Sequence, residues 1–550
     1  MIILDNLFKK CEELTKELVK IKSVNTTKGE KEIAEYIENY IRNIPYFKKH
    51  SDRVIIQKLK NDKLDRRNVF AYVKGTKEES NNTIIFHGHM DTVGTEDFGA
   101  LEKYSTNPDL LLEKMLEMDL SKEIRKDLET GDWMVGRGSC DMKSGVAVFL
   151  VLLEYFSERT DEFKGNILLS VNPVEENLHT GIIEGIEVLN KLKTQENFNY
   201  IMAINNDYIC PLYEGDTNKY VYTGTVGKLL PCFYIQGKET HVGQCFEGFD
   251  AAVLASEITR LINYNVDFCD GYNGEYTLPP SVLKMQDLKM HYNVQTTVDA
   301  FVYFNYFVHN NSIEEIMKKL IDVSNLAVSN LMDTINTNYK KYCDLAKIDY
   351  KKIDYDVKVI SYEEIYDLAL KNFKGNLDEE IENYTLKLIE ENTDKRETSM
   401  LIVKRLVEIA KTKDPMVVIF FAPPYCPHNT LKKEVKEEEE LSKKLRGLLD
   451  EFQDEVGETY EMLQFFPSLS DSSYIKIDDD EESIDKLIKN FPQYKNLYNV
   501  PLHEIKKLNI SAINYGCYGK DAHKWSERVY KPYSFGVLPK LIIKTVEKFM

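Results

Sequence analysis

The chain is poor in cysteine. It has nine cysteines among 550 residues, an odd number, and no two of them form a Cys-x-x-Cys pair. Secreted disulfide frameworks use even sets of cysteines at regular spacings, so this scatter argues against such a framework. The pattern favours a reducing compartment, and we expect a cytoplasmic protein.

Long apolar runs are also missing. No stretch approaches the roughly 18 consecutive apolar residues of a membrane span. The N-terminal segment places apolar side chains at helical spacing between charged ones, which differs from the unbroken apolar core of a signal peptide. We therefore expect neither a signal peptide nor a membrane as partner.

Basic residues are fewer than acidic ones. The chain has 71 Lys and Arg against 90 Asp and Glu, a formal net charge of −19. Since phosphate binding needs clustered basic side chains, this balance excludes nucleic acid as the expected partner. Hydrophobic residues make up 43 % of the chain, which is enough for the cores of two or three domains.

The order of apolar patterns predicts the fold class. Residues 1–216 alternate helical and strand patterns, which predicts an α/β domain with a mainly parallel sheet. Residues 217–361 follow a strand–helix–strand–strand–helix–strand order, which predicts an inserted α+β sandwich. Residues 362–550 return to the α/β pattern, with an apolar strand expected at 416–422. We therefore predict a catalytic domain in two parts and an inserted domain, interpreted as a lid.

Five separated segments carry side chains of the metal-ligating kind, most of them directly after a predicted strand. They are FHGHMDTVG with His89 and Asp91, GRGSCDMKSG with Asp141, SVNPVEENLHTG with Glu175 and Glu176, AINNDYICP with Asp207, and YGKDAHKWSERV with His523. Binding residues gather at the carboxyl ends of strands in open α/β sheets. Histidines and carboxylates suit zinc, and adjacent carboxylates can divide metal binding and proton transfer between them.

Each segment alone also has a structural reading, as a polar loop or a solvated acidic turn. The glycines around Asp141 could instead cradle a phosphate. However, GRGSCD matches neither the P-loop nor the dinucleotide fingerprint. The case for a metal site therefore rests on all five segments together.

Taken in order, the segments resemble the M20 metallopeptidase family, which includes carboxypeptidases, aminoacylases, dipeptidases and deacylases. HGHMDTV resembles its His-x-Asp-Thr-Val element, GRGSCDMKSG resembles its Gly-Arg-Gly-x-x-Asp-Met-Lys-x-Gly element, and EEN stands at its Glu-Glu pair. The resemblance covers nearly the whole chain. It implies a zinc-peptidase-like catalytic domain with an inserted lid domain.

The resemblance also implies a role for each matching residue. Asp141 would bridge two divalent metal ions, with His89 and Asp207 completing one site and Glu176 and His523 the other. The implied metal is zinc, with cobalt or manganese as alternatives.

Two acidic residues beside the implied ligands have other roles in the resemblance. Glu175 would be the general base toward the attacking water. Asp91 would hold the ring of His89, because a ligating histidine commonly needs a carboxylate partner.

The middle of the chain extends the resemblance. KETHVGQCFEGFDA is similar to the family's lid segment. The resemblance implies that His241 would stabilise the oxyanion. In the family this histidine often acts across a dimer interface, so a homodimer through the lid is one expected arrangement. Substrate-binding candidates by position are Asn293, Ser470, Asp471 and Ser472. The family often has an arginine where this chain has Tyr306. Tyrosine cannot make the bidentate contact with a substrate carboxylate that arginine makes.

The sequence thus predicts a two-metal hydrolase that cleaves an amide bond in a small amino-acid-derived substrate, in the manner of a deacylase or aminoacylase. The segments IFFAPPYCPH and FFPSLSDSSY look closest to an arginine-utilisation subgroup of the family, which implies a role in arginine catabolism. A strict dipeptidase or carboxypeptidase is one alternative. A non-catalytic binding module on the same fold is another, and the intact ligand set argues against it.

Overall fold

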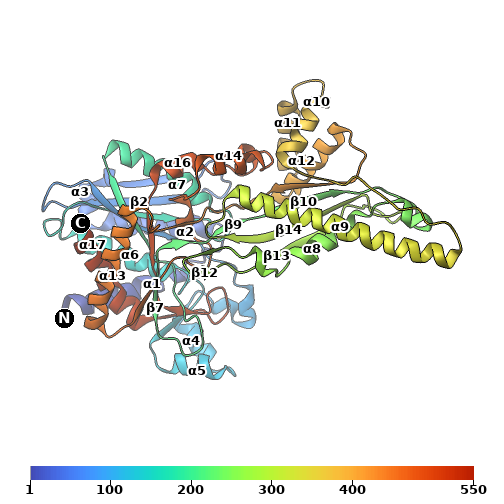
Figure 1. The fold of residues 1–550 in the computed structure, drawn as a ribbon. Coiled ribbons are helices and arrows are strands. Elements are labelled where there is room, and N and C mark those ends of the chain that lie inside the picture. Colours follow the sequence, from blue (N-terminus) through green and yellow to red (C-terminus); the bar gives the residue numbers. More distant parts are fainter. Residues whose placement is uncertain (1) are drawn as a thin grey trace. The chain divides into compact units, whose positions relative to one another are not determined.

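The computed structural model describes residues 2–550, which form two compact units (Figure 1). Unit 1 contains the chain up to Thr225 together with Asn429–Ile477 and Glu504–Met550. Unit 2 contains Val226–His428 and Asp478–His503. Among these residues, no helix combines the length and apolar character needed to cross a membrane.

Unit 1 is built on an eight-stranded sheet in the order β1-β2-β5-β3-β6-β19-β7-β18. The strands are β1 (Val54–Lys58), β2 (Arg67–Lys74), β3 (Asn82–His89), β5 (Asn166–Asn172), β6 (Asn199–Asn205), β7 (Lys219–Tyr222), β18 (Tyr460–Leu463) and β19 (Ala512–Tyr515). The central strands β5, β3, β6 and β19 run parallel. β2 pairs antiparallel with both β1 and β5, and β7 pairs antiparallel with β19 but parallel with β18. The predicted α/β class, with its central parallel strands, is confirmed.

Helices cover this sheet, and the most buried of them leads away from a candidate ligand. α6 (Lys143–Ser157) begins two residues after Asp141 and has the sequence KSGVAVFLVLLEYFS. A helix that is apolar all round is a core helix, and the Phe149 ring stacks on Phe86 of β3 at 4.8 Å between centroids. The other long helices of unit 1 are α1 (Ile2–Lys20), α2 (Gly29–Asn43), α7 (Thr180–Gln195), α13 (Lys436–Val456) and α17 (Leu538–Phe549).

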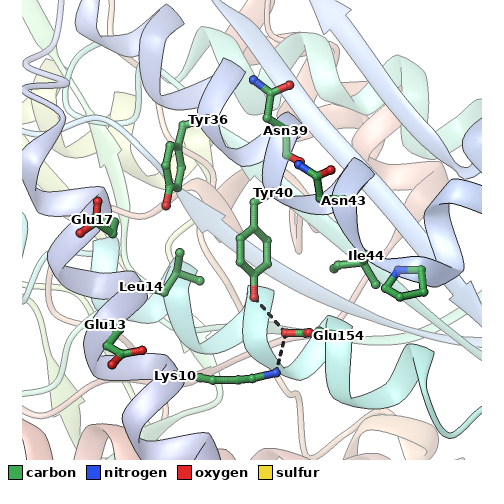
Figure 2. A pocket seen from close by; sticks show the side chains of 11 residues that line it. Lys10, Glu13, Leu14, Glu17, Tyr36, Asn39, Tyr40, Asn43, Ile44 and Glu154 are labelled. Carbon is green, nitrogen blue, oxygen red and sulfur yellow. Dashed lines mark hydrogen bonds and ion pairs between the residues drawn. The ribbon is translucent and has the colours of Figure 1, made fainter.

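A surface hollow of about 590 Å³ lies between α1, α2 and the far end of α6 (Figure 2). There Tyr40 Oη donates to Glu154 Oε2 at 3.1 Å, and Lys10 Nζ lies 3.1 Å from the same oxygen. The helix rise places Glu154 roughly 20 Å along α6 from Asp141. The hollow is therefore separate from the candidate metal ligands.

A small three-stranded sheet joins two parts of unit 1 that are distant in sequence. The segment between β3 and β4, here called the insertion, forms helices α4 (Pro108–Leu116) and α5 (Lys122–Glu129) and runs into β4 (Trp133–Val135). β4 pairs with β21 (Arg528–Tyr530), which pairs in turn with β20 (Gly519–Lys520). The β20–β21 hairpin carries His523, and β4 leads into the loop that carries Asp141.

Unit 2 has a six-stranded sheet in the order β13-β14-β10-β16-β15, with β9 also pairing to β14. The strands are β9 (Gly227–Leu229), β10 (Pro231–Gln236), β13 (Ser281–Asp287), β14 (Asp299–Val308), β15 (Lys358–Ser361) and β16 (Met416–Phe421). The helices that pack on it are α8 (Ala251–Ile262), α9 (Ile313–Ala346), α10 (Tyr362–Asn372), α11 (Leu377–Glu390) and α12 (Lys395–Ala410). An additional α+β unit inserted in the catalytic unit, as the sequence predicted, is therefore present.

The second boundary of the inserted unit differs from the expected position. We placed the return to the catalytic domain at residue 362, yet the segments up to His428 and from Asp478 to His503 pack within unit 2. The reason is β16, which lies between β10 and β15 and pairs parallel with β15. Every residue of its MVVIFF sequence is buried, so its pattern is that of a central strand but does not indicate which sheet it joins.

Candidate metal centre

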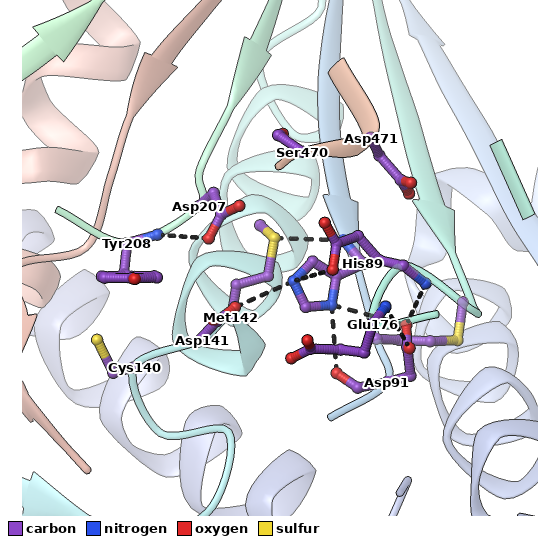
Figure 3. Close-up of polar contacts among 12 residues, drawn as sticks. His89, Asp91, Cys140, Asp141, Met142, Glu176, Asp207, Tyr208, Ser470 and Asp471 are labelled. Carbon is purple, nitrogen blue, oxygen red and sulfur yellow. Dashed lines mark hydrogen bonds and ion pairs between the residues drawn. The ribbon is translucent and has the colours of Figure 1, made fainter. Parts of the chain in front are cut away.

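The carboxyl end of β3 positions the first histidine. His89 is the last residue of β3, which lies between β5 and β6 in the sheet, and only 2 % of its side chain is exposed. Its Nε2 lies 3.1 Å from Asp141 Oδ1, and its Nδ1 lies 3.2 Å from the carbonyl oxygen of Asp91 (Figure 3). The ring therefore presents one nitrogen to the candidate bridging carboxylate.

Asp91 organises the loop that carries both glutamates. Its two oxygens accept hydrogen bonds from the backbone N–H groups of Glu175 and Glu176, each at 3.1 Å. Its carboxylate approaches His89 Nδ1 no closer than 3.6 Å. This buried carboxylate thus fixes where the Glu-Glu pair lies.

Asp141 lies between the two candidate metal-binding histidines. Its Oδ1 faces His89 Nε2, and its Oδ2 lies 3.1 Å from His523 Nε2. His523 Nε2 also lies 2.9 Å from Glu176 Oε1. One carboxylate that serves two histidines on opposite sides has the arrangement of a bridging ligand.

Two overlapping sets of donor atoms result. His89, Asp141 and Asp207 form one set, and Asp141, Glu176 and His523 form the other; within each set the donor atoms lie within 4.8 Å of one another. All five predicted ligands are therefore brought together, with Asp141 common to both sets. Such spacings fit ligands that share one metal ion with bond lengths of about 2 Å.

Asp207 is fixed from the neighbouring strand. It follows β6, and its backbone N–H donates to Asn514 Oδ1 on β19 at 3.1 Å, while Asn514 Nδ2 donates back to the Asp207 carbonyl at 3.1 Å. This pair of bonds holds the backbone at the strand end, so the Asp207 carboxylate is supplied by a rigid element.

The electrostatics of the cluster favour a divalent cation. Burial raises the pKa of Asp207 well above its ordinary value, and the charge of Asp141 raises it further. Burial likewise raises the pKa of Glu175 and of Glu176, although His89 and His523 respectively oppose the shift. Buried carboxylates in excess of nearby positive charge are costly unless they coordinate metal, so the donor set fits two cations.

The two histidines predict a pH dependence of metal binding. Hydrogen bonds that His523 donates to Asp141 and Glu176 raise its pKa to about 11. The surrounding carboxylates raise the pKa of His89, although burial opposes the shift. The surrounding carboxylates therefore favour the protonated form of both rings without metal, whereas a ligating histidine must be neutral. We expect metal loading at pH 7 to release protons, with affinity rising as pH rises. Calorimetric titration in buffers of different ionisation enthalpy measures this release, and none at all would contradict the ligand assignment.

The predicted substrate-binding loop lies at the same strand ends. Ser470 Oγ accepts a hydrogen bond from Asn205 Nδ2 at the end of β6 at 3.0 Å and lies 2.8 Å from Ser472 Oγ. Asp471 Oδ1 lies 2.9 Å from His179 Nδ1. All three loop residues are buried, so the loop is held next to the glutamate segment of unit 1.

The lid candidates lie together on unit 2. His241 forms a bridge with Gln295, whose side chain accepts a hydrogen bond from Asn293 Nδ2 at 3.1 Å. His241 and Asn293 are both exposed. Tyr306, by contrast, is fully buried beside Phe268, so its side chain is not available at the surface of unit 2.

The sequence analysis assigned no role to three residues that shape the site. His179 faces Asp471, and Arg137 Nη1 donates to Glu527 Oε2 at 2.8 Å. Arg137 lies in the GRGSCD segment and Glu527 comes four residues after His523. The only sequence signal for this ion pair was that Arg137 and Glu527 have opposite charges and lie in two of the five ligand-bearing segments.

Comparison with known proteins gives consistent results. The sequence profile of peptidase family M20/M25/M40 matches residues 85–424. Protein RocB of Bacillus subtilis (strain 168) is 40 % identical over 540 residues, 98 % of this chain and 95 % of RocB. Succinyl-diaminopimelate desuccinylase of Sulfurimonas denitrificans is 23 % identical over 373 residues, covering 67 % of this chain and 81 % of that protein. The crystal structure of aminopeptidase PepT from Bacillus cereus has a similar fold, with a TM-score of 0.52, 12 % identity and 98 % of each chain covered.

Proposed function

The chain belongs to peptidase family M20/M25/M40, and we propose that it uses two metal ions to cleave an amide bond in a small amino-acid-derived substrate. Membership of the family and likeness to RocB, both predicted from the sequence, are confirmed, and with them a metal-dependent hydrolase. The single observation that carries the proposal is the position of Asp141 between two complete donor sets.

The donor sets would hold two divalent ions, for which we propose zinc, with cobalt or manganese as alternatives. When bound, a pair of such ions polarises the substrate carbonyl and makes a shared water acidic enough to attack at neutral pH. The two sets take their shape from Asp91, Asn514 and the backbone, as described above. The chain itself therefore supplies a preorganised pair of sites.

Glu175 is proposed as the general base. Its Oε2 lies 3.9 Å from His89 Nε2, so it faces the first donor set, yet it is not a member of either set. It would take the proton of the attacking water and later give it to the leaving amine. Its burial keeps bulk water from competing for that proton.

The proposed substrate class rests on the burial of Tyr306 and on the proteins that this chain resembles. One relative is a desuccinylase, which supports a deacylase reading over a strict peptidase. The burial of Tyr306 removes one candidate for holding a C-terminal carboxylate and so disfavours a carboxypeptidase. The resemblance to arginine-utilisation proteins leads us to propose a basic amino-acid derivative as substrate and a role in arginine catabolism in the cytoplasm.

A hydrolysis screen tests this proposal. N-acyl amino acids and dipeptides, including arginine and ornithine derivatives, are assayed with zinc, cobalt and manganese. We expect metal-dependent release of the free amino acid from N-acyl substrates. Cleavage of dipeptides alone would favour the dipeptidase alternative, and bound metal with no turnover of either class would favour the non-catalytic alternative.

We further propose that unit 2 acts as a lid through His241. A donor aimed at developing negative charge stabilises the transition state, so His241→Ala is expected to lower kcat by about 10²–10³-fold. Metal content should stay unchanged. His291→Ala, which removes another exposed histidine of unit 2, is the matched control and should retain full activity. Equal activity of the two variants would leave His241 without a catalytic role.

The homodimer through the lid can be tested with the same variant. His241→Ala mixed with an inactive catalytic-unit variant should recover activity if each chain supplies what the other lacks, because the two chains then form one intact site. Absence of recovery, with subunit exchange demonstrated, would mean that His241 acts within its own chain.

A further inference from the structure

The loop that carries His523 has an unusual conformation for a ligand support. His523 lies at the tip of the β20–β21 hairpin with φ of +65°, and Asp521 has φ of +58°. Half of the His523 side chain is exposed. Left-handed backbone at a residue other than glycine persists only where surrounding contacts hold it, so contacts from outside the loop are needed to keep this conformation.

One set of contacts ties the loop to Asp141. Glu527 is 1 % exposed, and its Oε1 accepts hydrogen bonds from the backbone N–H groups of Cys140 at 3.0 Å and Asp141 at 3.2 Å. Its Oε2 accepts from Arg137 Nη1 at 2.8 Å, and its carbonyl oxygen accepts from the Gly136 N–H at 3.2 Å. One buried carboxylate thus fixes the distance between the segments of two ligands of the second donor set.

The next residue ties the loop to the insertion. Arg528 is also 1 % exposed, and its Nη1 donates to Asp521 Oδ2 within the loop. Its Nε and Nη2 donate to Asp127 Oδ2 of α5 at 3.0 and 2.8 Å. The Trp133 ring lies 5.4 Å from the guanidinium. The insertion therefore supplies a carboxylate to a buried arginine that holds the His523 loop.

We propose that Glu527 and Arg528 are positioning residues that set the affinity of the second metal ion, and that Asp127 of the insertion acts with them. The inference rests on the proposed two-metal function. Residues that orient ligands without touching the ion change metal affinity by about 10–100-fold. Because Glu527 and Arg528 are adjacent and hold the loop from two directions, His523 is kept facing Asp141 and Glu176 before any ion binds.

The test is a cobalt titration of the whole protein. The variants are Glu527→Gln, which places an amide N–H against donors that require an acceptor, and Asp127→Asn, which removes the charge opposite Arg528. Each should raise the Kd of the Co²⁺ ion in the second donor set by about 10–100-fold. Asp127→Asn should leave the Kd of the other ion unchanged, whereas Glu527→Gln should raise it less than that of the second-set ion, because Glu527 also holds the backbone of the shared Asp141. The visible spectrum of bound cobalt reports the missing second ion independently. Glu129→Gln, an exposed carboxylate on the same helix, is the matched control and should behave as the parent.

The outcomes separate this inference from the proposed function. An unchanged second Kd, or equal weakening of both ions, would overturn the positioning role. If Glu527→Gln fails to fold, Asp127→Asn, which alters only the insertion side, gives the decision alone. A parent protein that binds no cobalt would show that the proposed function itself is wrong, whereas a parent that binds two ions with unaffected variants would remove only this inference.

Discussion

Glu175→Gln is expected to lower kcat by about 10²–10⁴-fold while both metal ions stay bound. The magnitude is that of losing a general base, since an amide of nearly the same shape cannot accept a proton from water at neutral pH. Metal should be retained because Glu175 belongs to neither donor set. Steady-state kinetics together with metal analysis of the same preparation measure both properties.

The control for this variant is Glu187→Gln, an exposed glutamate of α7 that pairs with Lys60. It should match the parent in rate and metal content. Loss of one ion together with activity in Glu175→Gln would show that Glu175 is a ligand and would exchange its role with that of Glu176.

Asp141→Asn is expected to remove both ions and with them all measurable turnover. The Asp141 carboxylate faces His89 through one oxygen and His523 through the other. An uncharged amide is a weaker ligand on both sides, so neither donor set keeps a charged bridging oxygen. Metal content after dialysis, measured per chain, should fall from about two to near zero.

Two further ligand variants provide the comparison. Asp207→Asn and Glu176→Gln each alter one donor set only, so each should lose one ion and keep the other. If Asp141→Asn retained one ion as these variants do, Asp141 would be an ordinary ligand of a single site. The proposal of a shared carboxylate would then be withdrawn.

The sequence predicted the catalytic fold well where the apolar pattern was strong. The continuous apolar run of α6 and the short apolar runs of β3, β5 and β6 produce the alternation that predicted the α/β class, because buried elements require apolar side chains on every face they bury. The domain boundary near residue 362 could not be predicted in the same way. MVVIFF is a central strand in either sheet, and only its pairing partners, β10 and β15, assign it to unit 2.

The candidate ligands could be predicted because most of them follow a strand and all stand in segments that resemble the family's motifs. The residues that hold them could not. Glu527 and Arg528 form ion pairs with residues some 390–400 positions away in sequence, and no local pattern encodes such a contact. Asp127 lies on α5 of the insertion, and its role depends on its contact with Arg528, which is distant in sequence.

The central claim is that two ions share Asp141, and anomalous scattering from a zinc- or cobalt-loaded crystal tests it most directly. The account predicts two peaks about 3.5–4 Å apart, one beside His89 and Asp207, the other beside Glu176 and His523, with the Asp141 carboxylate between them. A single peak, or two peaks of which either lies beyond bonding distance of Asp141, would contradict it.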